Sequence, residues 1–595
     1  MDSIEKRLIA VRAQMAQSDY DALIVPRADE YLGEYIPPHN ERLLWMSGFS
    51  GSAGLVIILR DKAAIFVDGR YTVQVGQQVS DELFEFHHLV DEPHARWLAA
   101  QLPQGARVAY DPRMHSLQWQ QAAQSTFAEK SQVLVPEIDN LVDRCWADRP
   151  AARIDPALLL DEAFSGESST SKRQRIARDI VAKGAQAALI FAPDSVSWLL
   201  NIRGTDVPML PLVQSFAVLA ADSSLSLFID PGRVPPGLAE HVGEGLRVYP
   251  ESDSEAVLLS YGGKTVLADP ASANAWTQLT LREGGATLVC APDPVALPKA
   301  CKNTVEVTGS RQAHIRDAVA EVKFLCWLDG EVDAGRLHDE AVLSDKLLSF
   351  REVGERFRGL SFDTISAVGS NAAMCHYNHQ NGEPATLEMN SVYLLDSGAQ
   401  YTDGTTDITR TVAIGDPGDD IRGMYTRVLK GHIALDGAQF PKGTTGSQLD
   451  VLARQFLWSD GFDYDHGTGH GVGSFLSVHE GPQSISKRAG GADLRVGMIL
   501  SNEPGYYRDG CFGIRCENLL VVQAVDDPTY ETDMMKFDAL TMVPFDNRLL
   551  DMSLLTLAER NWIDRYHARV NTVLGPLLNG DEKVWMEHAT RPLAS

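Results

Sequence analysis

Residues 396–411 read DSGAQYTDGTTDITRT, and this stretch decides how the second half of the chain folds. The apolar run Val392–Leu395 leads into Asp396, and the strand-like run Ile408–Ile414 starts directly after Asp407. Two such runs joined by Gly and Asp turn residues are typical of a hairpin. Asp396 and Asp407, eleven positions apart, are therefore predicted to lie side by side at the ends of two paired strands.

The same arrangement occurs again further along the chain. Glu503 in SNEPGYY and Glu517 in GIRCENL are fourteen positions apart, again with Gly and Asp turn residues between them. His470 lies in GTGHGVG, where glycines let the backbone approach a cation closely. Carboxylates can bridge two cations and an imidazole binds one without adding charge, a mixture that suits manganese, cobalt or zinc.

These residues are predicted to form one metal centre. Taken singly, each carboxylate is more simply a solvated surface residue. That explanation fails for the set, because Gly-rich or apolar surroundings recur at every member and buried carboxylates need cations among them. Two neighbouring metal ions can activate water against a carbonyl, so the sequence favours a metallohydrolase. The predicted ligands are Asp396, Asp407, His470, Glu503 and Glu517.

Composition restricts the class of protein. With 595 residues the chain is too long for one core, so about three domains are expected. Hydrophobic residues make up 44% and charged residues 22%, which is ordinary for a soluble globular protein. The formal net charge of −27 argues against nucleic acid and anionic membranes as partners, since both attract basic surfaces.

Cysteine usage and the N-terminus indicate a compartment. The seven cysteines are odd in number and form no Cys-x-x-Cys motif, so a reducing compartment fits better than a disulfide framework. The first 25 residues are charged throughout and lack the apolar core of a signal peptide. No stretch is long and apolar enough to span a bilayer, and the chain is expected to be cytoplasmic.

The first half of the chain contains an internal repeat. Residues 20–71 and 186–233 each start with a buried-type strand, continue through polar residues to a tryptophan, and end in an Asp-Gly-Arg or Asp-Pro-Gly-Arg turn. The shared order makes duplication a better explanation than chance, so two related α/β domains are predicted. The turn residues Asp68 and Arg70 are expected to be structural.

Breaks in these patterns divide the chain into four parts. Proline and charge interrupt the pattern near residue 150, and a long helical segment over Glu306–Asp345 opens the second half. A helix-like stretch over Ser553–Leu578 lies near the C-terminus. The predicted domains are an α/β domain over 1–152, a related α/β domain over 153–303, a catalytic domain over 304–532 and an extension packed on it over 533–595.

Five motifs of the second half resemble the set found in the pita-bread metallopeptidases. They are DSGAQYTDGTTDITRT, HGTGHGVG, VHEGP, NEPGYY and GIRCENL. The chain resembles the long, three-domain, cytosolic-type Xaa-Pro aminopeptidases (aminopeptidase P) of this family over nearly its whole length. The resemblance implies a fold of α/β and α+β class, in which two related creatinase-like N-terminal α/β domains precede a pita-bread catalytic domain with a curved antiparallel sheet.

The resemblance also implies how the ligands share the metals. Asp396 would bind one ion alone, and Asp407 and Glu517 would bridge both. His470 and Glu503 would complete the other ion. The cofactor would be two divalent metal ions, manganese in the family's usual case, with cobalt or zinc still open. A hydroxide between them would attack the scissile bond, and Glu503 would help to move its proton.

Three further histidines gain roles only through the resemblance. A lone histidine is usually a surface or structural residue, and His379 is interpreted as structural. His376 would donate to the substrate beside the scissile bond, and His479 would stabilise the developing oxyanion. His466 would line the pocket beside the proline ring.

Neighbours of the last ligand complete the implied site. Tyr507 and Arg515 match positions that support the site and the substrate. Arg515 stands two residues before Glu517, so on a strand both side chains share a face and the guanidinium can orient the ligand. Cys516 replaces a more usual aliphatic residue, which would make the site sensitive to thiol oxidation.

The implied reaction is removal of the first residue from a peptide whose second residue is proline. An imide bond lacks the N–H that ordinary proteases grip, so a shaped pocket and metal-driven attack are required. Recognition of a free N-terminal amine would explain the exopeptidase action. The partners would be such peptides, with no nucleic acid and no membrane, and the enzyme would be a cytoplasmic homodimer.

Two alternatives stay open. Prolidase, an Xaa-Pro dipeptidase, shares the metal centre, although the duplicated N-terminal half favours an Xaa-Pro aminopeptidase. A catalytically inactive binding module of the same fold is the second, and the complete set of ligands argues against it. The N-terminal domains show no chemistry of their own and are expected to support dimerisation and partly cover the catalytic cleft.

Overall fold

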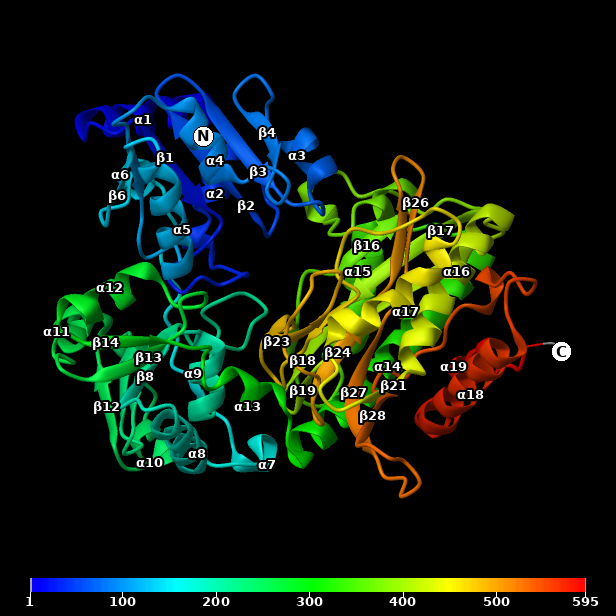
Figure 1. The fold of residues 1–595 in the computed structure, drawn as a ribbon. Helices are drawn as coiled ribbons and strands as arrows, with labels where there is room; N and C mark the ends of the chain where they lie inside the picture. Colours follow the sequence, from blue (N-terminus) through cyan, green and yellow to red (C-terminus); the bar gives the residue numbers. More distant parts are fainter. Residues whose placement is uncertain (1–2, 594–595) are drawn as a thin grey trace. The chain divides into compact units, whose positions relative to one another are not determined.

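The computed structural model describes residues 3–593, and the chain divides into two compact units (Figure 1). One unit comprises Met1–Glu162 and Glu167–Ala296, and the other comprises Leu297–Ser595 with the short segment Ala163–Gly166. Within residues 3–593, no helix combines the length and the apolar character that a membrane crossing requires.

The first unit contains a mixed sheet of six strands. In spatial order these are β4 (Glu85–His88), β3 (Ala63–Val67), β2 (Gly54–Leu59), β1 (Ala22–Pro26), β5 (Arg107–Tyr110) and β6 (Val133–Pro136). The hairpin contacts β1–β2 and β2–β3 are antiparallel, and the other three contacts are parallel. Every residue of β3 is buried, as expected for a strand covered on both faces.

A second sheet in the same unit repeats this topology. In spatial order its strands are β12 (Leu246–Tyr249), β11 (Leu225–Ile229), β10 (Ser215–Ala220), β8 (Ala187–Ile190), β13 (Thr265–Ala268) and β14 (Thr287–Cys290). The contacts β8–β10 and β10–β11 are antiparallel, and the other three are parallel. The predicted pair of related α/β domains is therefore confirmed.

The second unit contains the antiparallel strands that hold the predicted site. Strand β17 (Ser391–Ser397) pairs with β16 (Ile365–Val368) and with β20 (Ile408–Ile414). A larger sheet consists of β21 (Gln439–Pro441), β28 (Met534–Ala539), β27 (Asn518–Val525), β24 (Ile499–Asn502), β22 (Gly469–Gly471) and β23 (Glu480–Ile485). All contacts in both sheets are antiparallel, so the predicted antiparallel catalytic fold is confirmed.

The long helical segment predicted over Glu306–Asp345 is helical but interrupted. It consists of two helices, α14 (Thr304–Asp333) and α15 (Glu340–Glu352). Between them Gly335 adopts a φ of 72°, and Asp339 caps α15 by accepting a backbone hydrogen bond. Glycine enters this left-handed region without steric cost, which ends the first helix and lets the chain start another.

The C-terminal residues add two helices to the same core. Helices α18 (Leu557–Leu574) and α19 (Gly580–Ala589) contribute buried apolar residues to the cluster that includes the strands of the large sheet. The buried Arg410 of β20 donates to Tyr566 Oη of α18 at 3.2 Å. The extension thus contacts the strand that follows Asp407.

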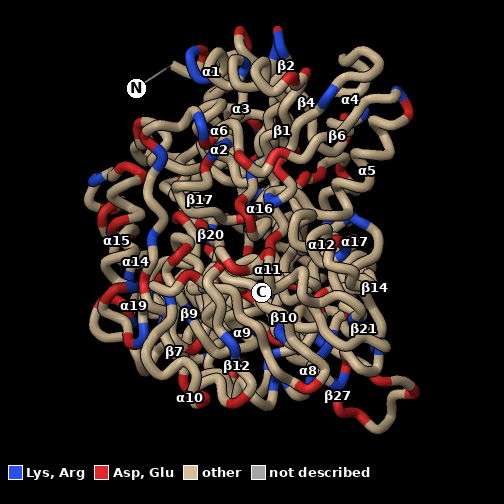
Figure 2. The backbone as a smooth tube through the Cα atoms, turned by 90° about the vertical axis from the view of Figure 1, so that its left-hand side faces the viewer, with Lys and Arg blue, Asp and Glu red and all other residues tan. Residues whose placement is uncertain are grey.

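Charged residues are spread along both units (Figure 2). The chain has 80 acidic and 53 basic residues, and the two signs are interspersed along the backbone. Some charges are buried: Arg351 and Arg454 are 0% exposed and Arg410 is 1% exposed. Each of the three donates to carboxylate or carbonyl oxygens, which is how a buried guanidinium is tolerated.

Candidate metal centre

Two hairpins position the acidic candidates. Asp396 lies in β17 opposite Thr409 of β20, and Asp407 directly precedes β20. In the larger sheet, the pairing of β24 with β27 extends to Asn502 opposite Asn518. Glu503 directly follows β24, and Glu517 directly precedes β27. The hairpins expected from the sequence are therefore present at both places.

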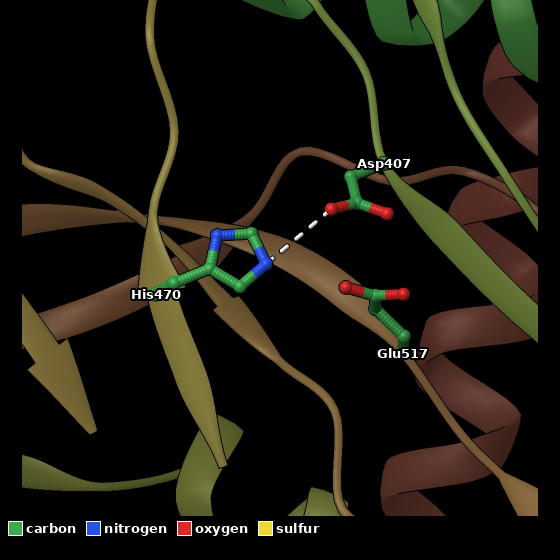
Figure 3. A group of neighbouring side chains, drawn as sticks. All are labelled: Asp407, His470 and Glu517. Atoms are coloured by element: carbon green, nitrogen blue, oxygen red, sulfur yellow. Dashed lines mark ion pairs between the residues drawn. The ribbon is translucent and has the colours of Figure 1, made fainter. Parts of the chain in front are cut away.

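Three of the candidates converge on one point (Figure 3). One ligand atom from each of Asp407, His470 and Glu517 lies within 4.8 Å of the others. His470 Nε2 is 3.5 Å from Asp407 Oδ2 and 3.5 Å from Glu503 Oε1. On its other side His470 Nδ1 donates to Gly471 O at 3.0 Å, which leaves Nε2 facing the carboxylates.

Arg515 connects Asp396 to the remaining ligands. Its side chain is 3% exposed and forms an ion pair with Asp396. Arg515 Nε also donates to Thr409 Oγ1 at 3.1 Å, and Thr409 donates to Glu517 Oε2 at 2.8 Å. A third bond runs from Arg515 Nη1 to Tyr507 Oη at 2.7 Å. One residue therefore orients two acidic candidates and a tyrosine.

Burial and mutual repulsion shift the pKa values of this group. Burial raises the pKa of Asp396 to about 6. Burial and the charge of Asp407 raise the pKa of Glu517 well above its usual range. Burial lowers the pKa of His470, but Asp407 and Glu503 outweigh this effect and raise it to about 9. The cluster therefore has more negative charge than its own cationic groups neutralise.

The donor set fits two divalent cations. Asp396 Oδ1 is buried and has no hydrogen-bond partner within the described part of the chain. A buried, unpartnered carboxylate oxygen is costly unless a cation meets it. Carboxylates with one imidazole are suitable ligands for manganese, cobalt or zinc. The surplus charge and the orphaned oxygen both point to bound cations.

Two of the accessory histidines lie against the cluster. The ring of His479 is centred 4.2 Å from the ring of His470. His466 Nε2 is 2.8 Å from Tyr507 Oη, the hydroxyl that also accepts from Arg515. The structure thus brings His466, His479, Tyr507 and Arg515 to the metal candidates.

His376 lies in the irregular segment 374–378 and is half-buried. The surroundings of the neighbouring Cys375 show which part of the site this segment contacts. Burial raises the pKa of Cys375 to about 11, against the charge of Arg515 and a hydrogen bond with Tyr507. The segment therefore borders the Arg515 side of the site. His379, interpreted as structural, is buried at 7% exposure.

Sequence reasoning missed a buried ion network behind the first hairpin. Arg351 is 0% exposed and pairs with Asp317 and Glu321, each at 2.8 Å. Ser397 and Thr406, the neighbours of the two aspartate candidates, donate to Glu321 at 2.8 Å and to Asp317 at 3.0 Å. In the sequence this network is visible only as two acids four positions apart on one face of α14. Such a pair is also common on the solvent-exposed face of a helix, so it does not indicate burial.

Cys516 differs from the expectation. Its thiol is 1% exposed, and burial raises its pKa to about 12. A buried, protonated thiol is inert toward oxidants, since the thiolate is the reactive form. Burial therefore argues against the predicted sensitivity to oxidation at this residue.

Models of protein families match four successive parts of the chain. Residues 309–524 match Metallopeptidase family M24, and residues 533–593 match the C-terminal region of that peptidase. Residues 7–145 and residues 148–306 each match the Creatinase/Prolidase N-terminal domain. The repeated α/β fold and the antiparallel unit described above each have a counterpart among these families.

Curated relatives and a solved structure cover the whole chain. Aminopeptidase P1 of Lotus japonicus is 38% identical over 660 residues, covering 99% of this chain and 100% of the relative. A probable Xaa-Pro aminopeptidase P of Tuber melanosporum is 39% identical over 618 residues, covering 99% of each. The structure of X-prolyl aminopeptidase from Caenorhabditis elegans, described as a cytosolic enzyme with a di-nuclear active site, superimposes over 100% of both chains with a TM-score of 0.95 at 33% identity. Together with the convergent acidic cluster, these similarities show that the chain belongs to the aminopeptidase P family within metallopeptidase family M24.

Proposed function

We propose that this chain is a metallo-exopeptidase that releases the N-terminal residue from peptides with proline in second position. The observation that supports it most is the convergence of Asp407, His470 and Glu517, with the remaining candidates on the same two hairpins. The names of full-length relatives, aminopeptidase P1 and Xaa-Pro aminopeptidase P, support the substrate class.

The proposed ligands would divide between two ions. Asp396 would hold one ion, His470 and Glu503 would hold the other, and Asp407 and Glu517 would serve both. Divalent ions at such a site lower the pKa of a bound water and polarise the scissile carbonyl. We propose manganese, with cobalt or zinc as alternatives that the same donor set accepts. The surplus of buried negative charge supports two ions rather than one.

Side chains of the protein would accept the proton of the attacking water and stabilise the negative charge that develops on the substrate carbonyl oxygen. The Glu503 side chain is 18% exposed and accepts from Ser501 Oγ at 3.3 Å, so it is held where it can take up a proton. We assign His479 and His376 as donors to the carbonyl oxygen as it becomes negative. Donors of this kind are typically worth ~2.7–4 kcal/mol of transition-state stabilisation each.

A connected polar wall supports the proline assignment. Tyr507 Oη is 2.8 Å from His466 Nε2 and 2.7 Å from Arg515 Nη1, so the three side chains fix one another. A cyclic imide offers no N–H to a protease, and a rigid wall can select it by shape instead. We propose that His466 lies beside the proline ring and that Tyr507 and Arg515 hold it there.

Recognition of a free N-terminal amine is proposed to restrict the enzyme to the chain end. A free amine can bind a metal ion or a carboxylate of the site, whereas an acetylated amine has neither the charge nor the free lone pair that this requires. Acetylation of a good substrate is expected to abolish its cleavage at equal enzyme concentration. Unchanged turnover of the acetylated peptide, measured by mass spectrometry, contradicts the amine assignment.

The function is tested by digesting a short Xaa-Pro-Yaa peptide with apo, manganese-, cobalt- and zinc-loaded enzyme. Release of Xaa by metal-loaded enzyme and none by apo enzyme is expected. Turnover of Xaa-Pro that exceeds that of Xaa-Pro-Yaa indicates a prolidase instead. Protein that binds no divalent ion after dialysis and releases nothing is an inactive binding module.

The remaining assignments concern the whole molecule. We propose a cytoplasmic homodimer with domains over 1–152, 153–303, 304–532 and 533–595, acting on peptides rather than on nucleic acid or membranes. The formal net charge of −27 supports peptide substrates over phosphate-bearing partners. The description of the Caenorhabditis elegans enzyme as cytosolic supports the compartment. Size-exclusion chromatography with light scattering measures the oligomeric state.

A further inference from the structure

A buried cluster of two lysines and one glutamate lies beside the proposed oxyanion donor. The side chains of Glu480, Lys302 and Lys299 are 0%, 1% and 3% exposed. Lys299 Nζ is 2.9 Å from Glu480 Oε2, and Lys302 forms the second ion pair with Glu480 Oε1. Charges buried this deeply are retained in a fold only when their partners are held in place.

The lysines themselves belong to a fixed segment. Lys302 N donates to Gly497 O at 3.0 Å, and a Cβ on Gly497 would lie 2.4 Å from Lys302 O, so the two backbones are in close contact. The next residue, Asn303, caps α14 through a capping box with Glu306. The ammonium groups are therefore presented from a rigid support rather than from a mobile loop.

Glu480 is connected to the site both along the chain, through His479, and across the sheet, through Gly471. It directly follows His479 and is the first residue of β23. Its backbone pairs with Gly471, the neighbour of His470, and a Cβ on Gly471 would lie 2.3 Å from Glu480 O. A displacement of Glu480 therefore moves the backbone that bears His479 relative to the backbone that bears His470. The two imidazole rings are now centred 4.2 Å apart.

We propose that Lys299 and Lys302 are positioning residues that hold His479 at the metal site through Glu480. The role of His479 rests on the proposed function; the placement of its ring does not. Neither lysine touches the substrate or a ligand in this assignment. Both lysines precede α14 at the start of the second unit, so they belong to the same compact unit as Glu480.

The test is a double-mutant cycle of Lys302→Met with His479→Ala. Lys302→Met alone is expected to lower kcat by roughly 10–100-fold with unchanged metal content, the usual loss when a group behind a functional residue is removed. In the His479→Ala background the same change is expected to cost less than about twofold, because both changes act on one group. Equal losses in both backgrounds, or no loss in the wild type, overturn the proposal.

Two controls separate positioning from general damage. Lys430→Met removes another shielded lysine, whose Nζ is 2.9 Å from Glu559, and is expected to leave kcat near the wild-type value. If Lys302→Met does not fold, Glu480→Gln replaces it in the cycle, because it keeps the side-chain size and both lysines. The same losses in both backgrounds overturn the proposal here as well.

A crystal structure of the Lys302→Met or Glu480→Gln protein gives a readout that does not depend on activity. The proposal expects the His479 ring to leave its place beside His470. A ring that keeps the present spacing overturns the proposal, whatever the kinetics show. Wild-type enzyme that releases nothing from Xaa-Pro-Yaa peptides contradicts the proposed function instead. In that case the position of the His479 ring in the variant crystal structure alone tests whether the lysines position His479.

Discussion

Arg515 and Asp396 form an ion pair between residues 119 positions apart, on two different strands of the catalytic unit. The same guanidinium donates to Thr409 and Tyr507 at 3.1 and 2.7 Å. It therefore fixes the orientation of one proposed ligand and, through Thr409, of Glu517. Removing an outer residue of this kind typically costs roughly 10–100-fold in metal affinity or activity.

Replacing Arg515 with lysine is expected to lower kcat/KM by roughly 10–100-fold, although the charge is kept. A single ammonium cannot donate to three acceptors in the planar geometry that a guanidinium offers. Arg508→Lys is the matched control, since Arg508 pairs with Asp420 and its side chain is 34% exposed. Equal losses in the two variants would mean that the contact with Asp396 has no special role.

Asp407→Asn is expected to remove nearly all activity, because the amide cannot bridge two cations with two anionic oxygens. The loss should exceed the roughly 10–100-fold that a residue behind the ligands costs. Asp68→Asn, which weakens the contacts of Asp68 with the neighbouring Arg70, should stay close to the wild type. Steady-state kinetics and metal analysis of both variants give the comparison, and similar losses would show that the site has been misplaced.

Asp436 makes the stability depend on pH. Burial raises its pKa from 3.8 to about 6; Oδ2 accepts from Trp562 Nε1 at 2.8 Å, and Oδ1 has no hydrogen-bond partner within the described residues. The folded state binds the proton of the Asp436 carboxyl more tightly than the unfolded state does. The contribution of this proton to the free energy of unfolding is therefore fully present below pH 3.8 and is lost as the pH rises through about 6. A shift of this size corresponds to roughly 2–3 kcal/mol.

Asp436→Asn is therefore expected to raise the melting temperature at pH 7.5 and to leave it unchanged near pH 4. The asparagine keeps an oxygen that accepts from Trp562 and removes the charge that burial disfavours. Thermal unfolding followed at several pH values measures the effect. A gain of the same size at both pH values would show that packing, and not ionisation, is responsible.

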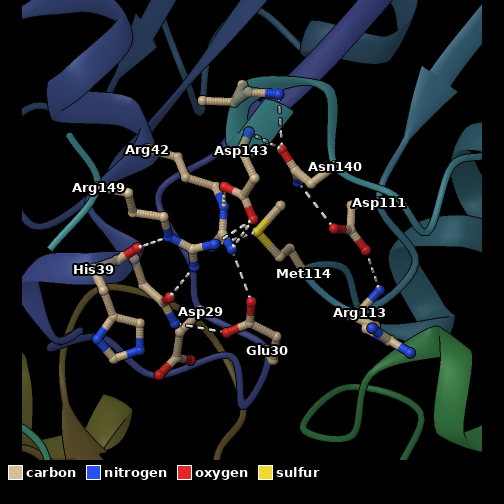
Figure 4. A network of polar contacts seen from close by, with 12 residues as sticks. Asp29, Glu30, His39, Arg42, Asp111, Arg113, Met114, Asn140, Asp143 and Arg149 are labelled. Carbon is tan, nitrogen blue, oxygen red and sulfur yellow. Dashed lines mark hydrogen bonds and ion pairs between the residues drawn. The ribbon is translucent and has the colours of Figure 1, made fainter. Parts of the chain in front are cut away.

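Arg42→Met is expected to destabilise the N-terminal unit by about 1–3 kcal/mol, because the partly exposed Glu30 loses its cation and Asp143 loses one of two. Arg42 is 1% exposed and donates to Asp143 at 2.7 Å and to Glu30 at 2.9 Å (Figure 4). Arg149 also donates to Asp143, at 2.7 Å, so Asp143 keeps one cation when Arg42 is replaced, whereas Glu30 does not. Arg60→Met, at a side chain 57% exposed, should cost at most about 1 kcal/mol. Denaturant unfolding that gives equal losses contradicts this account.

The placement of the candidate ligands and the repeated N-terminal fold could be predicted because each has a local signature. Alternating apolar runs and Gly-Asp turns mark the two hairpins, and their ends place Asp396, Asp407, Glu503 and Glu517. The repeat was visible because both copies keep the same order of strand, tryptophan and turn. Local patterns thus determined which residues end up at strand ends.

Contacts between distant segments could not be predicted in this way. Lys302 and Glu480 are 178 positions apart, and a lysine in such a segment resembles any solvated residue. Arg351 likewise gives no local sign that its partners lie on another helix. The break between α14 and α15 was missed because the apolar and charged pattern continues across Gly335, and only its φ shows the turn.

We infer that the five candidate ligands of the catalytic unit hold two cations. Anomalous diffraction from manganese-loaded crystals, recorded on both sides of the manganese absorption edge, tests it most directly. The account predicts two peaks about 3.5–4 Å apart, enclosed by these side chains. A map without paired peaks there, or with the metal bound elsewhere, contradicts it. The ligands concerned are Asp396, Asp407, His470, Glu503 and Glu517.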